Sequence, residues 1–333
     1  MVRRQTRTVW CAAITAGSLA APALAQSQEF VLSDDDAGQA WVSTNAPAPG
    51  TDEAFIADVR VLLAQGEPEK AKSLLNDWIK ANERTSNPNL GEAFLLRADA
   101  WFAMDREYKS LFDYEVVIRD FPDSDAFPVA IEREFEIGRM YLDGLRRRLF
   151  GMRIEPARGL GEELLIRVQE RMPGSRLAEE AAITLADHFY DRRQLDLAGD
   201  MYAIFLANYP RSEHREAALL RQIDCNVAQF KGPQYDGATL IEARLLLDDY
   251  AANYPTAAAR SGFTEGLETW IDESAAQQML EAASWYFGQN DDPSARLTLR
   301  RLIRRHPESA AAREAVRMMQ ERGWMAQADG GDS

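Results

Sequence analysis

Few residues of this chain are of the kinds that build cross-linked or metal-bound proteins. Only two cysteines and three histidines occur among its 333 residues. Cys11 lies in a segment that we expect to be removed, which leaves Cys225 as a lone thiol that cannot form an internal disulfide. His188, His214 and His306 lie too far apart in the sequence to form a metal-spaced cluster. We therefore expect no disulfide, metal or cofactor, and we expect Cys225 to be a small buried residue.

Motifs of the common catalytic families are also lacking. The sequence has no nucleophile elbow and no phosphate-binding Walker loop. The stretch "RGLGEELL" begins like a dinucleotide-binding motif, but we expect no strand before it, and Leu164 stands where the third glycine belongs. Neighbouring acids such as Asp248 and Asp249 are interpreted as solvated helix faces. The sequence predicts no catalytic residues and no enzymatic activity.

Positive charge is the minority sign in this chain. It has 53 acidic against 38 basic residues, a net charge of -15. A chain of this charge should not follow phosphate backbones, so we do not expect nucleic acid to be a partner.

The N-terminal segment has the three parts of a secretory signal peptide. Arg3, Arg4 and Arg7 precede an apolar run that is shorter than the roughly 20 residues needed to cross a bilayer. The run ends in "APALA", whose Ala23 and Ala25 form an A-x-A cleavage site. We predict a signal peptide over residues 1–25, cleaved after Ala25, and hence an exported protein.

Alternation of apolar and polar residues with period two is not found in any convincing run. Apolar residues instead recur three and four positions apart, as in Leu74, Leu75, Trp78 and Ile79, which is typical of helices. The sequence therefore predicts an all-α fold. Residues 26–51 show no helical period and are interpreted as a disordered tether, and residues 324–333 as a disordered tail.

Short hinges built around proline recur between the predicted helices. In "YPRS", residues 209–212, the proline ends one helix and Ser212 can cap the next. Related hinges are "FPDS", "MPGS", "YPTA" and "HPES" at residues 121–124, 172–175, 254–257 and 306–309. With Pro210 included, the five prolines lie 51, 37, 45 and 52 residues apart. Helix pairs of about 34 residues with insertions are the signature of tetratricopeptide repeats (TPRs).

The TPR pattern of large, small and aromatic positions also fits. With Pro210 as the closing proline, Ala186 and Ala198 fall at the small positions where the helices touch, and Tyr202 at an aromatic position. We predict a TPR superhelix over residues 52–323, with about six helix pairs and a C-terminal capping helix. The predicted helices span residues 52–65, 68–82, 90–104, 106–120, 125–143, 158–171, 176–191, 194–208, 212–230, 238–253, 258–289, 293–305 (capped by Asp292) and 309–322.

Two insertions interrupt the repeats, each inside a helix pair. The first, residues 141–159, groups Arg146, Arg147 and Arg148 just before Phe150; the second, residues 230–243, contains Gln234, Tyr235 and Asp236. Each insertion is either an elongated loop with local hydrogen bonds or an edge that docks a partner. On the second interpretation, we predict that the three arginines dock an acidic partner.

Aromatic residues of the second unit also have two possible roles. Phe94, Phe102 and Tyr108 either fill the core between repeats or line the concave groove, where an extended or helical peptide can bind.

The order of these features resembles one protein family. A TPR unit, the insertion "YLDGLRRRLFG", a "YP.S" hinge and then "GPQYDGATLIEA" leading to "YAANYP" resemble the BamD proteins (YfiO or ComL) of the outer-membrane β-barrel assembly machine, over roughly residues 52–310. The resemblance implies a periplasmic scaffold of about five TPRs. It also implies that the C-terminal repeats face the barrel-inserting component and that the N-terminal repeats receive unfolded outer-membrane precursors.

One feature departs from this family. BamD proteins are lipoproteins with a cysteine directly after the cleavage site, whereas here Gln26 follows it and Cys11 lacks a lipobox. No acyl anchor is therefore predicted. We expect a periplasmic protein that reaches the inner face of the outer membrane only through a partner.

A second class of periplasmic TPR protein shares the "YP.S" hinges. YbgF-like adaptors coordinate cell-wall synthesis or division and usually carry an N-terminal coiled coil. Residues 26–51 show no heptads, which disfavours this alternative.

Overall fold

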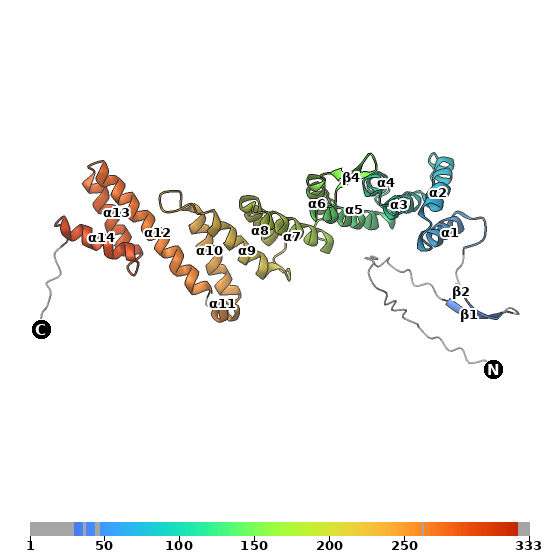
Figure 1. Ribbon diagram of the computed structural model, residues 1–333. Coiled ribbons are helices and arrows are strands. Elements are labelled where there is room, and N and C mark those ends of the chain that lie inside the picture. Colours follow the sequence, from blue (N-terminus) through green and yellow to red (C-terminus); the bar gives the residue numbers. More distant parts are fainter. Residues whose placement is uncertain (1–29, 36–37, 44–46, 262, 326–333) are drawn as a thin grey trace, which may run out of the picture.

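The structure is a computed structural model that describes residues 30–35, 38–43, 47–261 and 263–325. The predicted signal peptide, with its cleavage site at Ala25, and residues 326–333 of the predicted tail lie outside the described residues. In the described part, the helices follow one another along an elongated rod (Figure 1).

In the described residues, consecutive antiparallel helices form six pairs, and one further helix, α14, closes the array. The pairs are α1 with α2, α3 with α4, α5 with α6, α7 with α8, α9 with α10, and α12 with α13, while α14 packs on α12 and α13 as the capping helix. This confirms the predicted all-α TPR fold. The helices span Asp52–Ala64 (α1), Pro68–Asn82 (α2), Leu90–Ala103 (α3), Glu107–Asp120 (α4), Ala126–Leu142 (α5), Arg158–Arg171 (α6), Arg176–Asp191 (α7), Leu195–Asn208 (α8), Arg215–Gln229 (α9), Ala238–Asn253 (α10), Pro255–Ser261 (α11), Phe263–Gly288 (α12), Asp292–Arg305 (α13) and Ala310–Glu321 (α14).

Small residues let the helices approach closely, as the repeat pattern predicts. Ala186 of α7, Ala198 of α8 and the Tyr202 ring are fully buried. A close approach joins α5 and α6, where a methyl group at Gly161 would lie only 2.8 Å from the carbonyl oxygen of Gly138. Gly161 therefore serves helix packing, because the strand before α6 belongs to a two-stranded hairpin and not to a dinucleotide-binding unit.

A charged link repeats at two junctions between units. Tyr114 on α4 donates a hydrogen bond of 2.6 Å to Asp99 on α3, and Arg133 of the next unit reaches the same carboxylate at 3.2 Å. The same link recurs with equal sequence spacing from Tyr202 and Arg221 to Asp187. Buried polar groups need such partners, so each link satisfies its tyrosine while joining two units.

Two helix starts differ from the sequence expectation. The Ser212 hydroxyl accepts from the amide of His214, the residue before α9, and not from its first turn, because α9 begins only at Arg215. Asp291, one residue before the predicted cap Asp292, accepts from the amide of Ser294 at the start of α13.

Residues 26–51 are not wholly without regular structure. Strands β1 (Phe30–Asp35) and β2 (Gly38–Ser43) pair in antiparallel fashion with Asp35 opposite Gly38. The interpretation of this segment as a disordered tether is therefore wrong for the strands. Their sequences include Val31, Trp41 and Val42, which have high strand propensity.

The predicted disordered tail also begins too early. Trp324 stacks on Phe287 of α12 with ring centroids 5.8 Å apart. An indole with a stacking partner gains from burial, so the ordered array continues past Gly323.

The close approach of α5 and α6 predicts a sharp difference between two glycines of α6. Gly161→Ala should lower the free energy of unfolding by about 1–3 kcal/mol, because the new methyl group would meet the backbone of α5. Gly159→Ala, whose methyl group meets nothing within 4 Å, should leave stability unchanged or raise it by up to about 1 kcal/mol. Urea denaturation of both variants measures this, and equal effects would contradict the packing role.

A buried acid on α5 predicts a pH-dependent component of stability. Burial raises the pKa of Glu134 to about 7, opposed by the Arg171 guanidinium of α6 that contacts it. The folded state therefore binds this proton more tightly than the unfolded state, so the contribution of Glu134 to stability is full below about pH 4.5 and is lost as pH rises through about 7. Glu134→Gln should remove this component from a series of denaturation curves, whereas Glu163→Gln, on an exposed carboxylate, should retain it.

Candidate interaction surfaces

The first insertion is a β-hairpin that stands between α5 and α6. Strand β3 (Arg147–Leu149) pairs with β4 (Met152–Glu155), and Leu149 lies opposite Met152. Phe150 and Gly151 form the turn with φ angles of 51° and 83°. Two positive φ angles are what a tight two-residue hairpin turn requires, so the segment is a defined hairpin and not an elongated loop.

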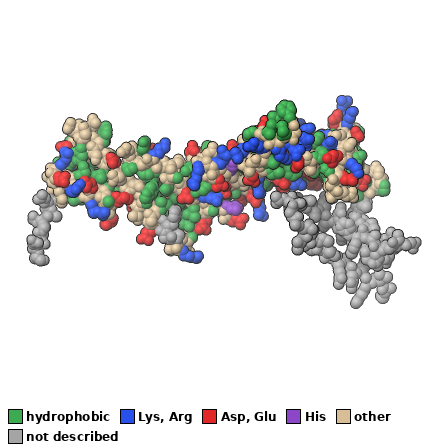
Figure 2. Space-filling model, viewed as in Figure 1, with side chains coloured by type: hydrophobic (Ala, Val, Ile, Leu, Met, Phe, Trp, Pro, Cys, Tyr) green, Lys and Arg blue, Asp and Glu red, His purple; other side chains and the backbone are tan. Residues whose placement is uncertain are grey.

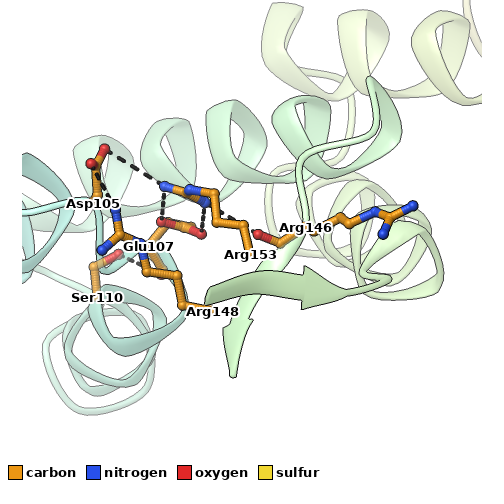
Figure 3. A network of polar contacts seen from close by, with 6 residues as sticks. All are labelled: Asp105, Glu107, Ser110, Arg146, Arg148 and Arg153. Atoms are coloured by element: carbon orange, nitrogen blue, oxygen red, sulfur yellow. Dashed lines mark hydrogen bonds and ion pairs between the residues drawn. The ribbon is translucent and has the colours of Figure 1, made fainter. Parts of the chain in front are cut away.

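Arginines of the hairpin hold it against the start of α4. Arg153 of β4 pairs with the buried Glu107 at 2.6 Å and also donates to the Arg146 carbonyl oxygen at 3.2 Å. Arg148 of β3 donates to Asp105 at 3.1 Å (Figure 3). A carboxylate as deeply buried as Glu107 is stable only with such a partner, so these contacts fix the hairpin in place.

An aromatic residue completes this support. The Arg147 guanidinium lies 3.4 Å from the centre of the Tyr108 ring, and Tyr108 meets Phe112 edge to face with centroids 5.4 Å apart. Arg147 also lies 3.6 Å from Glu155 of β4. Tyr108 therefore supports the hairpin, a role that neither sequence interpretation of this residue anticipated.

The three consecutive arginines do not form one free basic edge. Arg147 and Arg148 face the second unit, whereas the side chain of Arg146 is exposed and points away from the network (Figure 3). What the hairpin presents to solvent is apolar instead, with Phe150 at its tip 90% exposed.

Two of the predicted groove residues belong to the core between repeats. Phe94 and Phe102 are partly buried against the central apolar cluster, and Phe94 packs on Phe121 with centroids 6.1 Å apart. Of the two interpretations left open for these rings, the structure supports core filling.

The second insertion connects α9 to α10 and is held by local and long-range hydrogen bonds. The Tyr235 carbonyl oxygen accepts from Gln278 of α12 at 2.5 Å, and Asp236 accepts from the amide of Ala238 at 3.1 Å. The side chains of Gln234, Tyr235 and Asp236 remain exposed. The structure places this loop away from the hairpin, further along the rod (Figure 1).

A basic face on α13 was not predicted from the sequence, where only the arginines of the first insertion were considered as a docking edge. Five arginines lie within ten residues at helical spacing, and the buried residues of α13 lie between them: Arg296, Arg300, Arg301, Arg304 and Arg305. None of the five forms an ion pair with the described residues. The run "ARLTLRRLIRR" carries this signal in the sequence.

A cleft of about 420 Å³ adjoins this arginine face. Pro293, Leu297 and Trp324 supply its apolar lining, beside Arg296, Arg300 and Asp292, whose carboxylate pairs with Arg322 at 3.0 Å. Within the described structure, the buried Nε of Arg296 has no hydrogen-bond partner. The cleft can thus accept an apolar side chain next to a carboxylate.

The described residues contain no group of three or more His, Cys, Asp or Glu side chains placed to hold a metal ion. None of the helices in the described ranges is long and apolar enough to cross a membrane. His188 lies on α7, whereas His214 and His306 precede α9 and follow α13 respectively.

The chain belongs to the YfiO family of outer membrane lipoproteins, whose pattern matches residues 161–329. This match runs from α6 to the end of the array. TPR proteins of this kind are protein-interaction modules, so the fold and the family together define a scaffold that binds other proteins.

Comparison with solved structures finds other helical-repeat proteins. PilW, a widely conserved type IV pilus biogenesis factor, is 14% identical, with 81% of this chain and 100% of that chain covered and a TM-score of 0.29. The C-terminal part of a TPR repeat-containing protein from Cytophaga hutchinsonii is 12% identical, with 78% and 99% covered and a TM-score of 0.30. Among curated proteins, none matches this chain.

The buried pair under the hairpin makes a local prediction. Arg153→Ala leaves the Glu107 carboxylate buried without its partner and should cost about 2–3 kcal/mol, less than a fully buried pair because Arg153 is partly exposed. Amide hydrogen exchange in residues 147–155 should speed up accordingly. Arg146→Ala removes a neighbouring side chain that has no part in the support, because Arg146 contributes only its carbonyl oxygen, and exchange there should not change. Equal protection in both variants would contradict this account of the support.

Proposed function

We propose that this protein is a non-catalytic periplasmic scaffold that takes part in the assembly of outer-membrane β-barrel proteins. The observation that carries the proposal is the YfiO family match over residues 161–329, on a chain folded as a continuous TPR array. Stacked helix pairs offer long surfaces to other proteins, which suits a role in bringing partners together.

Export to the periplasm is part of this proposal. The charged start, the short apolar run and the A-x-A site before Gln26 support cleavage after Ala25. The mature chain would then carry a short N-terminal segment before the TPR array, which begins at residue 52 and includes Trp324. Contact with the inner face of the outer membrane would be peripheral.

The arginine face of α13 is the surface that we propose for the assembly partner. Arginines four residues apart repel one another along a helix, and this face has no acidic side chain within its run. The helix dipole favours Arg304 and Arg305 in the last turn, but it does not favour Arg296, Arg300 and Arg301. An acidic segment of a partner would remove this repulsion, with an apolar side chain in the cleft beside Trp324.

Unfolded barrel precursors are the second proposed partner. The concave side of the N-terminal repeats is the surface that the family resemblance assigns to them. Because Phe94 and Phe102 are committed to the core, the precursor would contact polar and partly exposed side chains of the first helices.

Capture from detergent-solubilised envelopes tests the proposal. The wild-type chain should recover a barrel-assembly protein, and Arg300→Glu combined with Arg301→Glu should reduce recovery by about tenfold, because charge reversal replaces attraction with repulsion. The loss should be greatest at low salt. Arg84→Glu combined with Arg211→Glu, two exposed arginines outside α13, is the matched control and should bind normally.

The identity of the captured protein decides between function classes. Recovery of cell-wall enzymes instead of barrel-assembly proteins would overturn the proposal in favour of a YbgF-like adaptor. If recovery of the barrel-assembly protein does not change when Arg300 and Arg301 are reversed to Glu, α13 is not part of the docking surface.

A further inference from the structure

The β3–β4 hairpin exposes apolar side chains and turns charged side chains towards the protein, which is the reverse of an ordinary surface hairpin. In β4, the side chains of Arg153 and Glu155 are the less exposed ones, and Arg153 turns towards α4. Met152 and Ile154 alternate with them and are 59% and 44% exposed. A sheet with one face in water normally places its apolar side chains towards the protein, so the outward face of this strand is built for a non-aqueous contact.

The tip concentrates the apolar surface. Phe150 is 90% exposed and Leu149 41% exposed, so four large apolar side chains lie within six residues (Figure 2). Phe150 has a φ of 51°, a left-handed conformation that is uncommon for an aromatic residue. The tight turn requires this conformation, and it places Phe150 at the end of the hairpin.

Basic side chains gather at the base of this apolar tip, together with the acids that they pair with. Arg146 is exposed, Arg148 and Arg153 pair with Asp105 and Glu107, and Lys109 at the start of α4 lies over the Trp101 ring of α3. Figure 2 shows blue side chains gathered beneath the green projection, although the chain as a whole carries a net charge of -15. Apolar side chains outermost and cations just behind them match the order of acyl chains and phosphates in a bilayer surface.

We propose that this hairpin inserts its tip into the surface of an anionic phospholipid bilayer. Leu149, Phe150, Met152 and Ile154 enter the boundary between headgroups and acyl chains, and Arg146 with its basic neighbours lies at the level of the phosphates. The tip is a projection and not a groove. A protein partner would need a matching pocket for it, whereas a bilayer adapts to its shape.

This inference does not rest on the proposed assembly role. The supporting pairs from Arg148 and Arg153 keep the hairpin in one orientation, so insertion requires no refolding. The hairpin lies on the insertion between α5 and α6, whereas the proposed partner surface lies on α13. Failure at one surface is therefore distinguishable from failure at the other.

Vesicle co-sedimentation tests the lipid contact with the full chain. Vesicles of phosphatidylethanolamine and phosphatidylglycerol should bind the protein more tightly than phosphatidylcholine vesicles. Phe150→Asp should weaken binding to the vesicles by about tenfold or more, because it removes the aromatic side chain that the bilayer would bury and adds a negative charge. Arg146→Glu should weaken binding chiefly at low salt. Leu245→Asp is the matched control, since Leu245 is 61% exposed on α10, and its binding should not change.

An environment-sensitive dye at the tip reports insertion directly. Phe150→Cys can be labelled selectively in a chain that also carries Cys11→Ser, because burial raises the pKa of the Cys225 thiol to about 11 and keeps it unreactive. The dye emission should shift to the blue on addition of anionic vesicles, whereas a dye at Leu245→Cys should not respond. No shift with vesicles, or a shift only when envelope proteins are added, would overturn the proposal and assign the tip to a protein partner.

Discussion

Close contact between helix backbones at small residues is the constraint on which this structure depends. Within the α5–α6 pair, the approach of Gly138 to Gly161 shows how little space the packing leaves. No helix pair can bury its apolar side alone, so each must pack on the next, and the links at Asp99 and Asp187 add polar contacts between successive pairs. Because neighbouring units are joined through their cores, insertions have room only at the ends of helices, and there the hairpin and the second loop emerge.

The sequence predicts the helical array closely because the array is encoded locally. Helix spacing, closing prolines and small residues such as Ala186 and Ala198 are properties of short segments, so the expected bounds of most helices agree with the structure to within one or two residues. The strands were missed for the opposite reason. β3 and β4 are three and four residues long, too short to show a period, and β4 carries its apolar residues on the outward face.

Arginines show why the candidate surfaces were harder to predict than the fold. Arg146, Arg147 and Arg148 are adjacent in the sequence. The hairpin that carries them packs on the buried carboxylate of Glu107 and the ring of Tyr108, which lie about forty residues earlier. Whether an arginine is free depends on such distant partners, which a single sequence does not place. On α13 the basic face follows from spacing once the buried side of the helix is known.

The buried thiol of Cys225 has a consequence for copies of this protein that meet in an oxidising compartment. Disulfide exchange needs a thiol that is both accessible and ionised. Cys225 is buried and the pKa of its thiol is raised, so it is neither. Two folded mature chains would therefore not be joined covalently, and small thiols would not cap the chain. Oxidative modification at this position becomes an indicator that a molecule has unfolded.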